Sequence, residues 1–208
     1  MYIKFSLLLV LWMCISCNAQ TKNVPTKLVG GGCEGCEAIF EYGDKKLTPI
    51  DTLPEYENNE PRLKITGTVF KNDEETPAEN VIIYIYHTNR QGIYETKGDE
   101  TDWAKRHGFI RGWVKTDKDG KYTFYTFRPA SYPDRSEPEH IHITVKEPDK
   151  NECYLDDYFF HDDPILTQNK RNKLGNRGGS GIMKPVEENG TLNIKRNIVL
   201  GKNIQNYE

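Results

Sequence analysis

The sequence lacks clustered positive charge and, beyond its first residues, any long hydrophobic run. Its 28 Lys and Arg are mixed with 31 Asp and Glu, and the formal net charge is −3. No basic stripe of the kind that binds nucleic acid is present, so nucleic acid is not an expected partner. Residues 168–190 are rich in Gly and Lys but lack the Gly-Lys-Ser/Thr ending of a phosphate-binding loop, and they are predicted to form a solvated loop.

Cysteine is also scarce, with five residues in all: Cys14, Cys17, Cys33, Cys36 and Cys153. A zinc site needs four ligands and no second CxxC motif exists, while a thioredoxin-like role requires a βαβ context that the sequence does not show. In an exported chain, a disulfide between Cys33 and Cys36 is the default expectation. Cys153 is left either as a free buried thiol or as a substitute partner for one of that pair.

The first seventeen residues have the pattern of an export signal. Lys4 precedes a mostly apolar run over residues 5–15, which is too short to span a bilayer. Residues 14–17 (CISC) resemble a bacterial lipobox, in which Cys17 becomes the lipid-modified first residue, and ordinary cleavage near residues 18–20 is the alternative. Both alternatives predict export, and the first predicts a periplasmic, outer-membrane or cell-surface lipoprotein anchored at Cys17.

The remaining chain favours one all-β domain. Residues 18–60 are expected to be a tether and an irregular lead-in, with at most a short element at 37–42, and residues 61–208 to be the domain. Strand-like runs rich in β-branched and aromatic residues occur at 63–70, 81–87, 110–116, 121–127, 140–146, 154–160 and 191–200. Asp117 to Gly120 reads as a hairpin turn, and residues 99–105 could hold a helical turn. The prediction is an antiparallel β-sandwich of immunoglobulin or transthyretin type with about seven or more strands.

Within the run 140–146, His140 and His142 are two residues apart. Side chains alternate along a strand, so both imidazoles are expected on one face, with Ile141 and Ile143 on the other. Two histidines placed in this way are a common arrangement of metal ligands, although such a pair taken alone is more often two exposed polar positions. Tyr132 lies eight residues before His140 in a loop after a strand, and Tyr94 lies after the strand 81–87.

A series of short sequence landmarks places these four residues in one recognisable pattern. They are, in order, residues 85–89 (IYHTN), 92–94 (GIY), 111–112 (RG), 116–124 (TDKDGKYTF), 126–133 (TFRPASYP), 138–142 (PEHIH), 158–160 (YFF) and 163–164 (DP). With these landmarks, residues 63–164 resemble the intradiol ring-cleavage dioxygenases, the catechol 1,2- and protocatechuate 3,4-dioxygenase family. The likeness covers about half the chain, which looks like a short exported lipoprotein member of that family.

The resemblance implies a mononuclear iron(III) site held by Tyr94, Tyr132, His140 and His142. Iron(III) is a hard cation, and anionic phenolates stabilise it against reduction. The resemblance further implies a catecholic substrate and O2, cleavage between the two hydroxyls, and a muconate-type diacid as product. Tyr132 would be the ligand that the substrate displaces and would take up one substrate proton.

Some positions depart from the family pattern. An arginine is expected three residues before His140, where this chain has Glu137, and Arg135 and Arg111 are the candidate catalytic replacements, although both are also typical surface charges. The glutamine expected after the histidines aligns with Asp157. Extra carboxylates near the pocket favour a neutral catechol over an acidic one. The alternatives are a non-catalytic sandwich lipoprotein that binds a metal or a catecholate, and a purely structural sandwich without metal.

Overall fold

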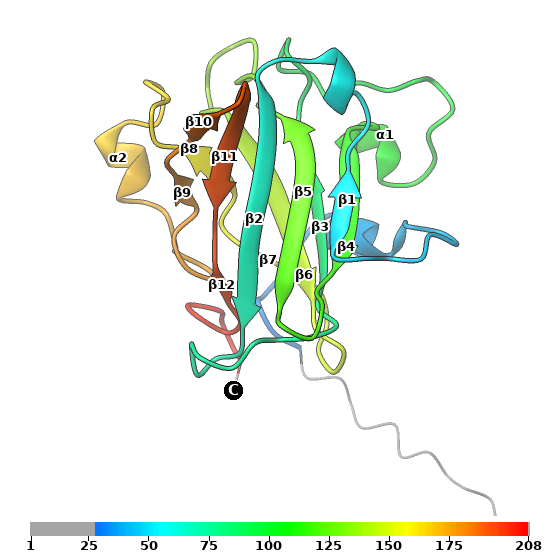
Figure 1. Ribbon diagram of the computed structural model, residues 1–208, viewed down its shortest axis with the longest axis vertical. Helices are drawn as coiled ribbons and strands as arrows, with labels where there is room; N and C mark the ends of the chain where they lie inside the picture. Colours follow the sequence, from blue (N-terminus) through cyan, green and yellow to red (C-terminus); the bar gives the residue numbers. More distant parts are fainter. Residues whose placement is uncertain (1–27, 208) are drawn as a thin grey trace, which may run out of the picture.

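Two six-stranded β-sheets pack face to face in the computed structural model, which describes residues 28–207 (Figure 1). The first sheet, in front in Figure 1, runs β1 (Ile50–Thr52), β5 (Lys121–Phe127), β2 (Arg62–Phe70), β11 (Thr191–Lys195) and β10 (Val186–Glu188), with β12 (Ile198–Val199) also paired to β2. The second sheet runs β4 (Arg111–Lys115), β3 (Ile82–Tyr86), β6 (His140–Lys146), β8 (Tyr158–Phe160) and β9 (Ile182–Met183), with β7 (Cys153–Tyr154) also paired to β6. The expected export signal and Cys17 lie outside the described residues.

The predicted all-β sandwich is confirmed, with one correction to its strand directions. The central pairs β2–β5, β3–β4 and β3–β6 are antiparallel, as expected. Four other pairs are parallel: β1–β5, β2–β11, β2–β12 and β8–β9. Strands contributed by the lead-in and by the C-terminal segment reach the sheets without a hairpin turn, so nothing obliges them to run antiparallel.

The hydrophobic core lies between the sheets and follows the alternation of the sequence. On β6, Ile141, Ile143 and Val145 are buried in the core. The same hydrophobic cluster includes Ile65 and Phe124 of the other sheet. The residues between them on β6 therefore point away from the core. This places His140 and His142 on the outer face of the second sheet, as the alternation predicts.

Part of the segment expected as tether and lead-in lies against the sandwich. The 3₁₀ helix η1 (Cys36–Phe40) packs Ala38 and Ile39 against Tyr84 and Trp113 on the outer face of the second sheet. A second 3₁₀ helix, η2 (Tyr56–Asn58), follows β1. The expected disulfide between Cys33 and Cys36 is present at the start of this segment. Among the cysteines of residues 28–207, Cys153 is a free, buried thiol.

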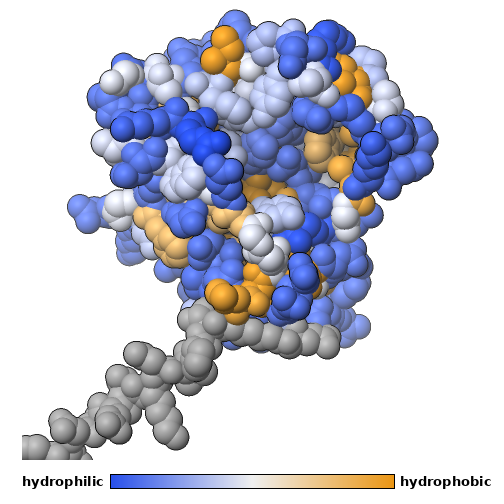
Figure 2. All heavy atoms as spheres, turned by 180° about the vertical axis from the view of Figure 1, so that it is seen from behind, coloured by the Kyte–Doolittle hydropathy of each residue, from blue (hydrophilic) through white to orange (hydrophobic). Residues whose placement is uncertain are grey.

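Helix is confined to short segments in this part of the chain. The expected helical turn is α1 (Ala104–His107), and α2 (Gln168–Arg171) lies in the long loop after β8. Between residues 28 and 207, no helix has the length and apolar character needed to cross a membrane. Figure 2 shows the face behind that of Figure 1, which is mostly hydrophilic with hydrophobic residues in small separate areas.

Candidate metal centre

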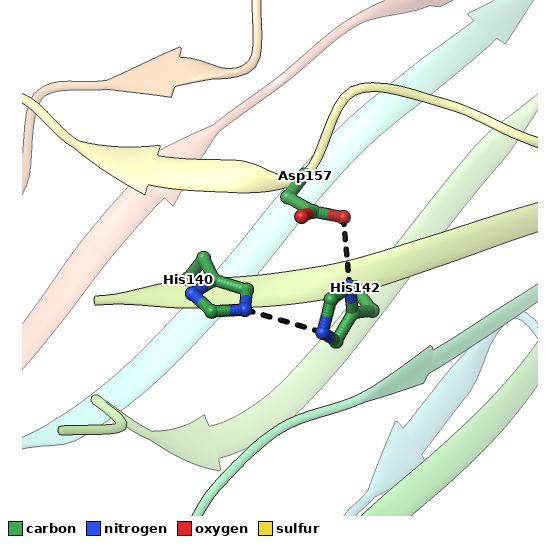
Figure 3. Close-up of side chains that lie close together, drawn as sticks. All are labelled: His140, His142 and Asp157. Carbon is green, nitrogen blue, oxygen red and sulfur yellow. Dashed lines mark hydrogen bonds and ion pairs between the residues drawn. The ribbon is translucent and has the colours of Figure 1, made fainter. Parts of the chain in front are cut away.

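Strand β6 carries two histidines side by side at the end of the second sheet. His140 is buried and His142 is half-buried, and their Nε2 atoms are 3.1 Å apart. Figure 3 shows both rings on the same side of β6, with Asp157 next to His142. His142 lies opposite Tyr86 in the β3–β6 register, and the two rings stack with centroids 4.5 Å apart. The ring of His142 is therefore held on one flank by its neighbouring strand.

The two predicted tyrosines come from loops that pack backbone against backbone. Gly92, in the turn before Tyr94, lies against Ser131, which directly precedes Tyr132. A Cβ at residue 92 would lie 2.1 Å from the carbonyl oxygen of Ser131. The Thr88 hydroxyl donates to the Ala130 carbonyl at 2.7 Å and thus also ties the two loops together. These contacts bring side chains 38 residues apart in the sequence to one point.

The polar atoms of all four predicted ligands meet there. The hydroxyl of Tyr94 is 2.8 Å from that of Tyr132 and 2.7 Å from Nε2 of His142. The hydroxyl of Tyr132 is 3.3 Å from Nε2 of His140. The four atoms form a closed ring whose sides are 2.7–3.3 Å long.

In each histidine, the hydrogen bond made by Nδ1 determines whether Nε2 carries a proton. Nδ1 of His140 is 2.7 Å from the Pro138 carbonyl, which can only accept, so this nitrogen carries the proton. Nδ1 of His142 is 3.1 Å from the Asp157 carboxylate and donates to it. In neutral imidazoles both Nε2 atoms then present lone pairs, and these face each other at 3.1 Å. Burial, together with neighbouring His142, lowers the pKa of His140 and keeps this ring neutral.

This arrangement fits a bound cation better than it fits hydrogen bonds alone. Two phenols supply two protons for four close contacts, and with both imidazoles neutral the contact between the two Nε2 atoms contains no donor. Donor atoms about 2 Å from a shared ion, at angles near 90–110°, are themselves about 2.8–3.3 Å apart. The sides of the ring match these separations. Two phenols and two imidazoles therefore form a donor set suited to a hard metal ion, and tyrosinate is an established iron ligand in proteins.

The two phenols differ in how firmly they hold their protons. Burial, and the hydrogen bond that it gives to Tyr132, hold the pKa of Tyr94 well above its ordinary value. Burial also raises the pKa of Tyr132, but the hydrogen bond accepted from Tyr94 acts in the opposite direction. Of the two tyrosines, Tyr132 is therefore the one on which a negative charge is better supported.

Asp157 belongs to the site but lies behind it. Its carboxylate and the two histidines could together hold an ion, since their ligand atoms lie within 4.8 Å of one another. However, Asp157 binds Nδ1 of His142 (Figure 3), whereas the Tyr94 hydroxyl contacts Nε2 on the other side of the ring. A carboxylate behind a ligating histidine fixes its tautomer and orientation, and the contacts favour this role for Asp157. Burial opposes its ionisation, but the electrostatic attraction of the His142 N–H and its hydrogen bond outweigh burial and lower the pKa of Asp157.

A hollow of about 190 Å³ opens beside the two tyrosines and His142. Tyr86 and His107 line it with parallel rings 3.8 Å apart. Its other walls include Arg106, which pairs with Glu34 of the disulfide loop. The sequence did not single out Arg106 or Glu34. The signal for Tyr86 was present, because it lies within the landmark IYHTN.

The two arginines proposed as catalytic residues do not line this hollow. Arg111 donates to Glu41 at 2.6 Å and lies over Trp113, lining a separate hollow at the β1–β4 edge. Arg135 is exposed on the loop after Tyr132 and lines neither that hollow nor the one beside the tyrosines. Glu137, at the position where the family has arginine, pairs with Lys170 of α2. The only arginine lining the hollow beside the tyrosines, within the described residues, is Arg106.

Comparison with known proteins assigns the family. The Dioxygenase_C family, described as Dioxygenase, matches residues 44–174, well over half of the chain. The chain belongs to the intradiol dioxygenase family. The beta chain of protocatechuate 3,4-dioxygenase from Burkholderia cepacia is 29% identical over 137 residues, which cover 60% of this chain and 58% of that one. This intradiol dioxygenase homologue thus spans somewhat more than half the length of that curated relative.

Solved structures show the same fold. The dioxygenase domain of a dioxygenase carbohydrate-binding protein fusion from Streptomyces sp. SirexAA-E superposes with a TM-score of 0.53 at 22% identity, covering 67% of this chain and 79% of that one. Catechol 1,2-dioxygenase from Acinetobacter sp. ADP1 superposes with a TM-score of 0.56 at 18% identity, covering 74% and 57%. At these identities the likeness establishes the β-sandwich of the family.

Proposed function

We propose that this protein holds iron(III) through Tyr94, Tyr132, His140 and His142 and cleaves catechols between their two hydroxyls. One catechol and one O2 give one muconate-type diacid, since the carbon–carbon bond between the hydroxyl-bearing carbons breaks and each of these carbons ends as a carboxyl group. The observation that carries the proposal is the pair of Nε2 lone pairs facing each other at 3.1 Å, closed by two phenols, in a chain of the intradiol family. With both imidazoles neutral, hydrogen bonds alone leave the contact between the two Nε2 atoms without a donor.

The metal and the side chains divide the work. Iron(III) held by Tyr94, Tyr132, His140 and His142 would supply the Lewis acidity that makes a bound catechol dianion reactive toward O2. A catechol must lose two protons to bind in this way, and the Tyr132 phenolate oxygen is placed to accept one of them. Tyr132 is half-buried on a loop, whereas His140 is part of a central strand, so Tyr132 is the donor that can move aside.

The hollow beside the donors positions the substrate ring. An engineered apolar cavity of about 150 Å³ holds one benzene ring, so about 190 Å³ suits a single ring with two hydroxyls. The aromatic side chains of Tyr86, Trp103 and His107 line this space. Packing of the substrate against these rings would exclude water from the reacting carbons.

The visible spectrum of the iron-loaded domain tests the proposal. A tyrosinate-to-iron(III) charge-transfer band should appear, shift when catechol is added without oxygen, and bleach with oxygen uptake when air is admitted. The Tyr94→Phe variant should lose most of this band, and Tyr56→Phe, which changes a tyrosine that packs on Tyr125 in the other sheet, should keep it. Absence of the band in protein shown by elemental analysis to contain iron would refute the site.

A binding protein without turnover is the second candidate. Its support is specific: neither Arg111 nor Arg135 lines the hollow beside the tyrosines, and the usual arginine position holds Glu137, paired with Lys170. A band that shifts with catechol but does not bleach in air would assign this second function.

We also propose, from the sequence alone, that the mature chain is a lipoprotein anchored at Cys17. Metabolic labelling of the full chain with a radioactive fatty acid in a bacterial host should mark the wild type and not Cys17→Ser. Equal labelling of both would contradict the anchor.

A further inference from the structure

A second, larger hollow lies next to the candidate metal centre. It has a volume of about 680 Å³ and shares three wall residues with the smaller hollow: Glu34, Tyr86 and His142. The two spaces are therefore neighbours, and the ring of a proposed iron ligand lies at their border. The disulfide loop lies along both, since Glu34 lines the two hollows while Cys33 and Cys36 line the larger one.

The volumes of the two hollows differ by more than threefold, and this difference bears on the substrate. The smaller hollow suits one ring, as argued above. Simple catechol would leave the larger hollow unused, although it opens directly beside the donors. The volume of about 680 Å³ falls within the range of about 300–1,000 Å³ that is typical of sites for drug-sized ligands.

The lining of the larger hollow indicates the chemistry of what it would hold. Tyr154 is exposed, and Arg177 lies 3.8 Å from its ring centroid, so the pair forms a broad, flat wall. Leu174 and Leu155 add aliphatic surface. Such walls suit a planar or aromatic group.

Charge in the larger hollow is close to balanced. Lys173 and Arg177 lie among its walls, together with the carboxylates of Glu34, Asp156 and Asp157. Asp156 is already engaged, because it accepts from the backbone N–H groups of Asn176 and Arg177. With no excess of free positive charge, the hollow does not favour an acidic substituent over a neutral one.

We infer that the substrate is a catechol that carries a bulky, neutral, ring-containing substituent, with the catechol ring in the smaller hollow and the substituent in the larger one. This inference rests on the proposed function and adds the class of substrate to it. Glu34, Tyr86 and His142 then form the border across which the two parts of one molecule are joined.

Binding without oxygen tests this inference separately from turnover. Dissociation constants of the iron-loaded protein are measured by anaerobic calorimetry for 4-methylcatechol and for (+)-catechin, whose catechol ring carries a neutral bicyclic group. Catechin should bind at least about tenfold more tightly, because its second ring system gains apolar contacts in the larger hollow.

Filling the larger hollow should remove that preference. In Leu174→Trp the indole occupies part of the space, and the ratio of the two dissociation constants should fall to near one. Val186→Trp adds the same side chain at an exposed position on β10 of the other sheet and should leave the ratio unchanged. If Leu174→Trp does not fold, Tyr154→Ala, which removes the aromatic wall, should weaken catechin binding several-fold.

Each outcome decides between the claims. A wild type that binds 4-methylcatechol as tightly as catechin overturns this inference and leaves the proposed function standing. Equal losses in Leu174→Trp and Val186→Trp overturn it as well. If neither catechol binds to protein shown to contain iron, the proposed function fails and this inference fails with it.

Discussion

At the scale of single residues, the candidate centre depends on which nitrogen of each histidine carries the proton. The Pro138 carbonyl and the Asp157 carboxylate accept hydrogen bonds from the two Nδ1–H groups, and this leaves both Nε2 atoms as acceptors. The main chain supplies the first of these partners, so no side-chain substitution can remove it. The second is a side chain and can be tested.

Replacing Asp157 should loosen the metal. In Asp157→Ala the ring of His142 loses its Nδ1 acceptor, and iron affinity should fall about 10- to 100-fold. Asp157→Asn keeps an acceptor oxygen and should lose less. Competition with a chelator of known affinity measures both. Asp162→Asn removes a carboxylate that pairs with Arg128 at the surface and serves as the matched control. Unchanged affinity in Asp157→Ala would show that Asp157 does not orient His142.

His87 provides a pH-dependent contribution to stability away from the donors. It is fully enclosed between the Thr126 hydroxyl, 2.6 Å from Nε2, and the Thr88 carbonyl, 2.8 Å from Nδ1. The carbonyl requires a proton on Nδ1, so Nε2 accepts from the hydroxyl and the ring is neutral. Burial lowers the pKa of His87 from 6.5 to about 4.

Acidification should therefore destabilise the protein through His87. Above pH 6.5 the ring is neutral in both states and its contribution is intact, whereas between pH 6.5 and about 4 only the unfolded chain binds the proton. The loss reaches about 3 kcal/mol once both states are protonated. Urea unfolding across this range should give a shallower pH slope for His87→Gln than for the wild type. His107, whose pKa burial also lowers to about 4, is present in both proteins and cancels in the comparison. Parallel slopes would contradict the assignment.

At the scale of secondary-structure elements, the loops after β3 and β5 do as much for the site as strand β6. The strand fixes the two histidines by alternation alone, but the tyrosines meet only because Gly92 allows its loop to approach Ser131 closely. Gly92 also has φ of 76°, in the region that favours glycine.

The Gly92→Ala substitution should separate the two tyrosines. The new methyl group would lie 2.1 Å from the Ser131 carbonyl oxygen, so one loop must shift, and the charge-transfer band of the iron-loaded protein should weaken strongly. Gly98 in the same loop has φ of 98° but nothing within 4 Å of an added Cβ. Gly98→Ala therefore imposes similar backbone strain without the clash, and its band should match the wild type. Bands of equal strength in the two variants would show that this contact does not position the tyrosines.

The same elements show how far the sequence predicts the fold. Five of the seven expected strands match β2 to β6 within one or two residues, because alternation and β-branched residues mark them clearly. The run 191–200 divides into β11 and β12, since Arg196 turns inward and donates to the carbonyls of Asp156 and Arg177. A buried arginine whose terminal N–H groups donate to main-chain carbonyls of distant loops leaves no mark in local periodicity.

The candidate site, like the fold, was predicted only in part from the sequence. The four donors follow from the landmarks, which preserve residue type and order along the chain. Arg106 and Glu34 could not be found in that way, because their pairing depends on how the disulfide loop packs beside α1. Arg135 was chosen because it is two residues from Glu137, and Arg111 was a second candidate; neither of them lines the hollow beside the tyrosines.

At the scale of the whole molecule, the four donors connect parts that the hydrophobic core alone does not fix. Tyr132 follows β5 of the first sheet, whereas Tyr94 follows β3 and the histidines lie on β6 of the second. A cation bound to all four therefore joins both sheets at one end of the sandwich. The unfolded chain cannot hold the donors together, so binding energy adds to folding stability.

Removing iron should therefore lower the melting temperature of the whole domain. At free iron about 100 times the dissociation constant, binding adds about 2.7 kcal/mol to the free energy of unfolding. For a domain of this size, that corresponds to a difference of about 5–10 °C between the loaded and the chelator-treated protein. Thermal unfolding followed by circular dichroism measures it, with Tyr56→Phe as a variant that should keep the full difference and Tyr94→Phe as one that should lose most of it. Equal melting temperatures in loaded and stripped protein, with iron verified by elemental analysis, would mean that the metal lies outside the four-donor ring, because a cation held between the two sheets must resist their separation.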